Sequence, residues 1–389
     1  MRLVQDLVRF KMPNEEPDEA IPYDQQEDEG DFSGPISFKD AVVVNTDWTI
    51  ETINLQINKG NIDLQPGFQR RIAWDDVRKS RLIESIIVSV PVPNIVLAEN
   101  QTYRGKFIVI DGKQRLVSIN EFLEGRFSLK GLDIRRDLIN KDINSIPQDD
   151  RDYLENATLR TSLIRNWRDQ NFLYTIFFRL NSGSLPLSPQ ELRRAMFGGH
   201  LLSAIDTFLI GSNNFQRLFG RDLDRRMRDS ELVLRFIAFE LAATSYRGDF
   251  RGFLDAITSH FESNWMNEVA RAQFCFERLD LALGFCFELF GNNAFKKWVG
   301  DSYERVINRA IFDCLTRFFS DEDIVIAARQ NQQQVILAYQ DLCLNADFRS
   351  SIEKTTKSMT SFKTRINMWG SALAACLTKQ YNSQTMRIV

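Results

Sequence analysis

Residues 107–115 read Phe-Ile-Val-Ile-Asp-Gly-Lys-Gln-Arg. The run opens with four apolar residues, three of them β-branched, which favours a buried strand. Gly112 supplies the backbone freedom for a sharp turn. After Lys113, apolar residues recur at helical spacing, and Gly125 stands where a helix would end: Leu116, Ile119 and Leu123. The stretch therefore predicts a strand, a tight turn and a helix.

The turn also gathers polar side chains: Asp111, Lys113, Gln114 and Arg115. A helix N-terminus carries unpaired N–H groups and a partial positive charge, so with adjacent cations it forms an anion-binding site. The alternative is an ordinary junction in which Asp111 caps the helix and Arg115 is solvated. This stretch alone favours neither interpretation.

The composition indicates a globular protein of two or three domains. The chain has 389 residues, of which 43% are hydrophobic and 26% charged. We find no apolar run long enough to span a bilayer and no secretory pattern, and we therefore expect a cytoplasmic protein without a membrane partner.

Cysteine and histidine usage argues against a metal site. The five cysteines form no CxxC pair and are expected to be buried, reduced thiols. The two histidines, His200 and His260, lie in different segments, which argues against a His-rich site and against an HNH-type nuclease module in this chain.

Charge is distributed unevenly. The net charge is −3, but residues 14–31 hold nine acidic side chains and no Lys or Arg, so the rest of the chain carries +6. That surplus permits a phosphate-rich partner. Residues 1–35 are predicted to be an acidic disordered tail. One hypothesis is that this tail imitates nucleic acid and covers a basic groove.

The fold is predicted to be α+β over residues 36–198 and all-helical over 199–389. In the first part we expect strands at 61–64, 94–98, 107–110, 127–132 and 158–164, the second and third as an antiparallel pair. Helices are expected after Asp47, at 76–90, 147–156 and 172–180, and from Ser188, where Glu191 completes a capping box. Further helices are expected at 201–210, 229–244, 249–261, 266–289, 301–318, 322–328, 332–343 and 361–380.

Five short motifs occur in a fixed order: Phe68-Gln69-Arg70 with Trp74, Pro91-Val92-Pro93, Ile110–Arg115, Arg179-Leu180-Asn181-Ser182-Gly183, and Leu187–Arg193. Together they resemble the N-terminal domain of the GmrSD-type restriction endonucleases over about residues 60–200. The chain departs from the family pattern at Lys113, where Gln is usual. A multi-part match in order is far more specific than any single motif.

This resemblance implies a fold similar to the ParB and sulfiredoxin group, with a strand–turn–helix that binds nucleotide phosphates. It implies NTP binding, with hydrolysis and a Mg²⁺ requirement left open, and a role in restriction or defence against phage DNA. The expected partners are a nucleotide, duplex DNA and, because the chain lacks an HNH pattern, a separate nuclease or other defence protein.

Carried over residue by residue, the resemblance assigns catalytic roles to Asp111, Gln114 and Arg115. Gly112, Lys113 and Arg115 would bind phosphate, with Arg70 as a converging cation and Asn181 as a neutral donor.

Three other interpretations remain open. In the first, the chain is a non-catalytic DNA- or protein-binding module, and Lys113 in place of the usual Gln is the best argument for it. Alternatively, Asp111 and Lys113 form the Asp-x-Lys half of a metal-dependent nuclease motif. Finally, Arg225 and Arg226 contact the DNA backbone, or else belong to an internally paired loop, since nearby acids offset the arginines.

Overall fold

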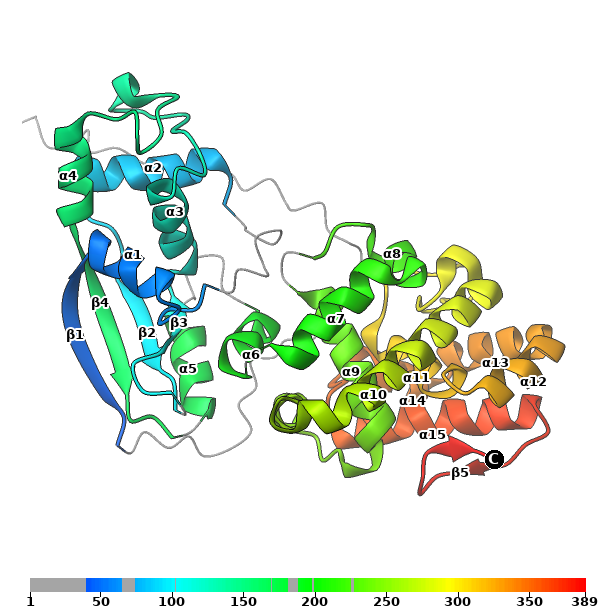
Figure 1. The fold of residues 1–389 in the computed structure, drawn as a ribbon. Helices are drawn as coiled ribbons and strands as arrows, with labels where there is room; N and C mark the ends of the chain where they lie inside the picture. Colours follow the sequence, from blue (N-terminus) through cyan, green and yellow to red (C-terminus); the bar gives the residue numbers. More distant parts are fainter. Residues whose placement is uncertain are drawn as a thin grey trace, which may run out of the picture.

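The computed structural model describes residues 40–64, 74–101, 103–168, 170–180, 188–197, 199–224 and 227–389. Within them the first half is a small sheet covered by helices and the second half is mostly helical (Figure 1). The predicted combination of a mixed first half and a helical second half is confirmed. Among the described residues, no helix combines the length and apolarity needed to cross a bilayer.

The sheet has four strands in the order β1 (Val42–Thr49), β4 (Thr158–Arg165), β2 (Ile95–Glu99) and β3 (Phe107–Asp111). β4 runs antiparallel to β1 and parallel to β2, while β2 and β3 form the predicted antiparallel pair. Of the predicted strand at 61–64, only a bridge from Ile62 to Phe107 is present.

β1 was not predicted, and the prediction of a helix capped by Asp47 is wrong in its start. Helix α1 (Ile50–Asn58) is capped by Thr49, whose Oγ1 accepts the N–H of Thr52 at 3.1 Å. The first residues of β1 are exposed at the sheet edge, so the strand lacks the alternating apolar pattern that identifies a half-buried strand.

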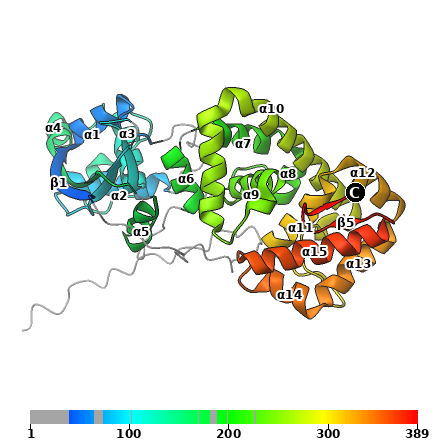
Figure 2. The ribbon, with the colours of Figure 1, turned by 90° about the horizontal axis from the view of Figure 1, so that it is seen from below.

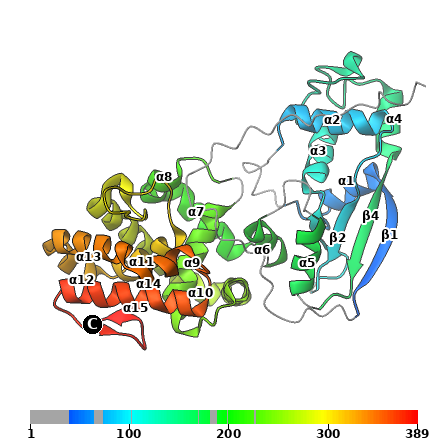
Figure 3. The same cartoon turned by 180° about the vertical axis from the view of Figure 1, so that it is seen from behind.

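Helices cover both faces of the sheet. One core contains Ile95, Leu97, Phe107 and Val109 together with α1, α2 (Asp76–Ile87), α3 (Lys113–Leu123) and α4 (Gln148–Asn156). The other contains Val96, Ala98, Ile108 and Ile110 with α5 (Gln170–Leu180) and α6 (Pro189–Phe197). Figure 3 shows α5 and α6 on the second face. Burial from both sides explains the uninterrupted apolar run of β3.

The predicted strand at 127–132 is wrong, because this segment is irregular. Side chains of α2 satisfy the backbone of this segment and the next: Ser80 Oγ accepts the N–H of Lys130, and Glu84 accepts those of residues 133–135. A 3₁₀ helix follows at Arg136–Leu138. α2 ends at Ile87, three residues before the predicted end at residue 90, and Val90 is exposed.

The second half packs around one core rich in phenylalanine. Its helices are α7 (His200–Gly211), α8 (Asn213–Phe219), α9 (Arg228–Ala242), α10 (Phe250–Phe290), α11 (Arg309–Phe319), α12 (Glu322–Gln330), α13 (Gln332–Leu344), α14 (Ala346–Glu353) and α15 (Met359–Cys376), with 3₁₀ helices at Ala243–Ser245 and Gly291–Asn293. α10 is the longest of these helices and is kinked at Asn264; its course can be followed in Figure 2.

Four features of this half correct the sequence-based prediction. α10 joins two predicted helices, α11 begins at Arg309 rather than 301, and α8 and α14 were not predicted. A hairpin of β5 (Tyr381–Asn382) and β6 (Arg387–Ile388) shows that the half is not entirely helical. All five cysteines are free and four are buried, as expected of reduced thiols.

Candidate functional site

The turn between β3 and α3 has the predicted strand–turn–helix form. Gly112 adopts φ 94° and ψ 12° between Asp111 and Lys113. A Cβ at this position would lie 3.1 Å from Nη2 of Arg115 and 3.2 Å from Cγ1 of Ile95, in a backbone conformation that L-residues rarely adopt. Both the conformation and the close approach of Arg115 therefore require glycine here.

Arg115 ties the turn together. Its Nη2 donates to Oδ2 of Asp111 at 2.7 Å and to the carbonyl of Asn94 at 2.9 Å, and its side chain is only 14% exposed. The ordinary-junction interpretation is therefore wrong in both parts. Arg115 is not solvated, and no side chain of the described residues caps α3. The first N–H groups of α3 thus lack a side-chain acceptor.

Two buried polar atoms at this turn have no hydrogen-bond partner among the described residues: Oε1 of Gln114 and Nε of Arg115. A buried polar atom left unpaired costs about 1–3 kcal/mol. Oε1 of Gln114 is an acceptor and Nε of Arg115 is a donor, so a polar ligand that offers both a donor and an acceptor would satisfy the two atoms. The residues present therefore fit a nucleotide-like molecule.

Lys113 is a second cation of the turn, beside Arg115. Burial lowers the pKa of its amino group, Glu191 and Asp63 oppose that change, and Arg194 adds to it. Glu191 belongs to α6, where the predicted capping box is confirmed: Oε2 of Glu191 accepts the N–H of Ser188 at 2.6 Å, and Oγ of Ser188 accepts the N–H of Glu191 at 3.1 Å. The negative charge of Glu191, at the start of α6, therefore acts on Lys113 in the turn.

Arg193 of the last motif and the adjacent Arg194 have a structural role. Arg193 is fully buried, and its Nε lies 2.6 Å from Oδ1 of Asp255 in α10. Arg194 lies 2.7 Å from Asp206 in α7. These pairs join α6 to the helical half.

The other predicted site residues, Arg70, Asn181, Arg225 and Arg226, lie outside the described residues. Next to the last two, Arg228 Nη2 lies 2.7 Å from Oδ1 of Asp224, as expected of an internally paired loop. No group of three or more potential metal ligands occurs in the described part of the chain. His200 and His260 are exposed and lie beside Glu262 and Glu268.

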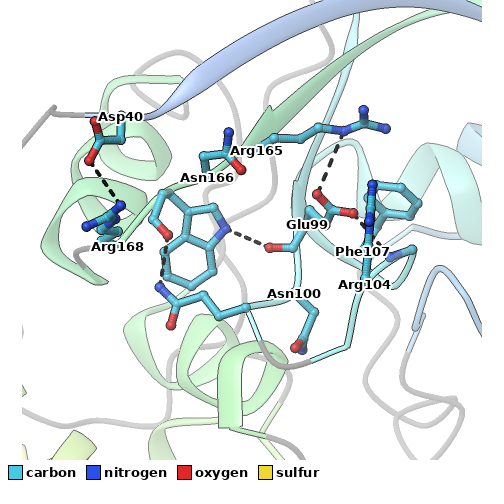
Figure 4. A pocket seen from close by; sticks show the side chains of 11 residues that line it. Asp40, Glu99, Asn100, Arg104, Phe107, Arg165, Asn166 and Arg168 are labelled. Atoms are coloured by element: carbon cyan, nitrogen blue, oxygen red, sulfur yellow. Dashed lines mark hydrogen bonds and ion pairs between the residues drawn. The ribbon is translucent and has the colours of Figure 1, made fainter.

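A pocket of about 1390 Å³ lies at the other end of the sheet, where β2 and β4 end (Figure 4). It is lined by Asp40, Glu99, Asn100, Gln101, Arg104, Gly105, Phe107, Arg165, Asn166, Trp167 and Arg168. Sequence reasoning missed this pocket, because Arg104 lies about 60 positions before Arg165 and Arg168, and only the pairing of β2 with β4 brings them together.

Residues 50–198 match the model of a family described as GmrSD restriction endonuclease, N-terminal domain. The match contains all five motifs in the order given above. Neither a search of curated proteins nor one of solved structures gave a match. Residues 50–198 of this chain therefore form a domain of the GmrSD restriction endonuclease N-terminal domain family.

Proposed function

We propose that this chain is an NTP-binding component of a DNA-targeting restriction or phage-defence system, with the nucleotide held at the turn Asp111–Arg115. The family of residues 50–198 supports the restriction role. The observation that carries the nucleotide site is the uncapped start of α3 beside two buried polar atoms that lack partners. A ParB/sulfiredoxin-like fold for the first half is part of the same proposal.

The turn offers what a polyphosphate needs. N–H groups at a helix N-terminus donate to phosphate oxygens and carry a partial positive charge. Arg115 is already oriented by Asp111 and Asn94, so little side-chain freedom is lost when its Nε–H meets a phosphate oxygen. Lys113 adds a compact positive charge.

In hydrolysis, Asp111 would orient water or a Mg²⁺ ion that arrives with the nucleotide. Arg115 engages Oδ2 of Asp111, and the side chain of Asp111 is 26% exposed. Gln114 would orient the attacking water, and Arg115 would stabilise the charge that develops on the transferred phosphoryl group.

The test is calorimetric titration of ATP, GTP and CTP with Mg²⁺ into wild type and Gln114→Glu. The substitution keeps the side-chain shape but places a negative charge beside the phosphates, so we expect affinity to fall at least about tenfold. Gln148→Glu, at the start of α4, is the matched control and should bind as wild type does. Unchanged affinity in both Gln114→Glu and Arg115→Ala would contradict the site.

The same preparations separate the competing functions. Nucleotide binding without turnover, with and without DNA, favours a non-catalytic module. Mg²⁺-dependent DNA cleavage that needs no nucleotide and is lost in Asp111→Asn favours the nuclease interpretation.

A further inference from the structure

The pocket opposite the nucleotide turn lies at the carboxyl ends of two parallel strands, β2 and β4, a place where open sheets commonly bind ligands. Its wall is fixed by hydrogen bonds. Nε1 of Trp167 donates to the carbonyl of Glu99 at 2.7 Å, and Nε2 of Gln101 donates to the carbonyl of Trp167 at 3.1 Å. Trp167 is itself buried in the second core. The pocket is therefore a built feature of the fold.

Cations surround its opening. We call Arg104, Lys106, Arg165 and Arg168 the basic rim; the three arginines line the pocket, and Lys106 precedes Phe107 in the same hairpin. Figure 4 shows Arg104 and Arg165 on one side and Arg168 on the other. Nζ of Lys106 lies 6.0 Å from the ring of Tyr103, which is 63% exposed. The rim thus combines four cations with an exposed aromatic ring.

The acids at the pocket hold these cations only loosely. Nε of Arg165 is 3.8 Å from Oε2 of Glu99, and Nη2 of Arg168 is 3.4 Å from Oδ2 of Asp40. Exposed pairs of this kind contribute about 0–1 kcal/mol. Arg168 is 80% exposed, and Arg104 makes no ion pair within the described residues. Guanidinium N–H groups therefore remain available for phosphate, which arginine binds with two parallel hydrogen bonds.

We propose that the basic rim binds the phosphodiester backbone of duplex DNA, at the end of the sheet away from the nucleotide turn. The choice of duplex DNA rests on the proposed function, whereas the anionic character of the ligand follows from the rim itself. The negative charges of Asp40 and Glu99 oppose phosphate and weaken the contact. Contacts to the phosphodiester backbone fix the position of a duplex but carry no sequence information, so the rim does not by itself read a base sequence.

The test is fluorescence anisotropy of a labelled duplex with the full chain between about 50 and 200 mM salt. The triple variant Arg104→Ala/Arg165→Ala/Arg168→Ala should bind about 10- to 100-fold more weakly. Its slope of log affinity against log salt should be smaller by about 3, because each phosphate contact contributes about 0.9. Arg136→Ala, at an exposed arginine of the 3₁₀ helix 136–138, is the control and should match wild type.

A second variant tests the rim in the opposite direction. Asp40→Asn removes a charge that opposes phosphate and leaves Arg168 unpaired, so affinity should rise several-fold. Asp40 has φ 69°, which asparagine also tolerates, so this change keeps the backbone even if the triple variant unfolds.

Wild-type affinity and salt slope in the triple variant, or no gain in Asp40→Asn, would overturn the inference. So would a wild-type chain that binds no duplex. The nucleotide titrations with Gln114→Glu decide separately whether the nucleotide proposal holds.

Discussion

Arg193 of α6 and Asp255 of α10 form a buried ion pair across the junction of the two halves, with Nε 2.6 Å from Oδ1. Nη1 of Arg193 also donates to Oε1 of Gln190 on its own helix. The first turn of the same helix carries Glu191, whose negative charge opposes the lowering of the pKa of Lys113 in the turn Asp111–Arg115. α6 therefore links the turn to the helical half (Figure 1).

Breaking this pair should weaken the whole molecule. Arg193→Met leaves the carboxylate of Asp255 buried without its cation, and such changes cost about 3–5 kcal/mol. Urea unfolding of the full chain measures the effect. The double variant Arg193→Met/Asp255→Leu should recover part of the loss, because it leaves no unpaired charge. A cost below about 1 kcal/mol in Arg193→Met would show that the pair does not hold the halves together.

Gly112 should tolerate no side chain. Gly112→Ala places a Cβ 3.1 Å from Nη2 of Arg115 at φ 94°, and we expect a loss of about 2–3 kcal/mol in the free energy of unfolding. Gly60→Ala is the matched control, since Gly60 has φ 65° with no atom within 4 Å, and should cost about 1 kcal/mol. Equal losses in the two variants would mean that the contact with Arg115 adds nothing.

Lys113 should make stability depend on pH in the alkaline range. Burial lowers the pKa of Lys113 in the folded state below its ordinary 10.5, so the unfolded chain binds more protons between the two values. At neutral pH Lys113 is charged in both states, so the free energy of unfolding is reduced by the whole cost of burying that charge. The free energy of unfolding rises as the pH increases from the folded-state pKa to the unfolded-state pKa. Lys113→Gln removes this cost.

Urea unfolding between pH 7 and 10.5 checks this expectation. The stability advantage of Lys113→Gln over wild type should be largest at neutral pH and shrink as pH approaches 10.5. Lys59→Gln, at an exposed lysine, controls for the loss of one positive charge. An advantage that is constant over the whole range would contradict the assignment.

Deleting residues 1–34 should tighten DNA binding. The deletion removes ten acidic and three basic side chains and leaves the remaining chain net positive. Asp40, the first described residue of the chain, lines the pocket beside the basic rim. Affinity for duplex should rise most at low salt, where charges are least screened. The same anisotropy assay measures this, and unchanged affinity at about 50 mM salt would refute the hypothesis that the tail competes with DNA.

Local chemistry made several elements predictable. The run 107–123 identified β3, the Gly112 turn and α3, because a continuous apolar run gives way, within a few residues, to apolar residues at helical spacing. The Ser188–Glu191 box marked the start of α6, since a cap needs only its own first turn. The motifs around them also indicated the family of residues 50–198.

The tertiary structure decided what depends on distant partners. β1 is a strand because β4 pairs with it, and 127–132 is not one because α2 satisfies nearby backbone groups. Arg193 connects the two halves because it forms a buried ion pair with Asp255. The basic rim exists because β2 lies beside β4. The sequence by itself determined the strand–turn–helix and its polar residues. Which charges are buried, paired or gathered around a pocket was decided by contacts between segments far apart in the chain, and such contacts leave no local pattern.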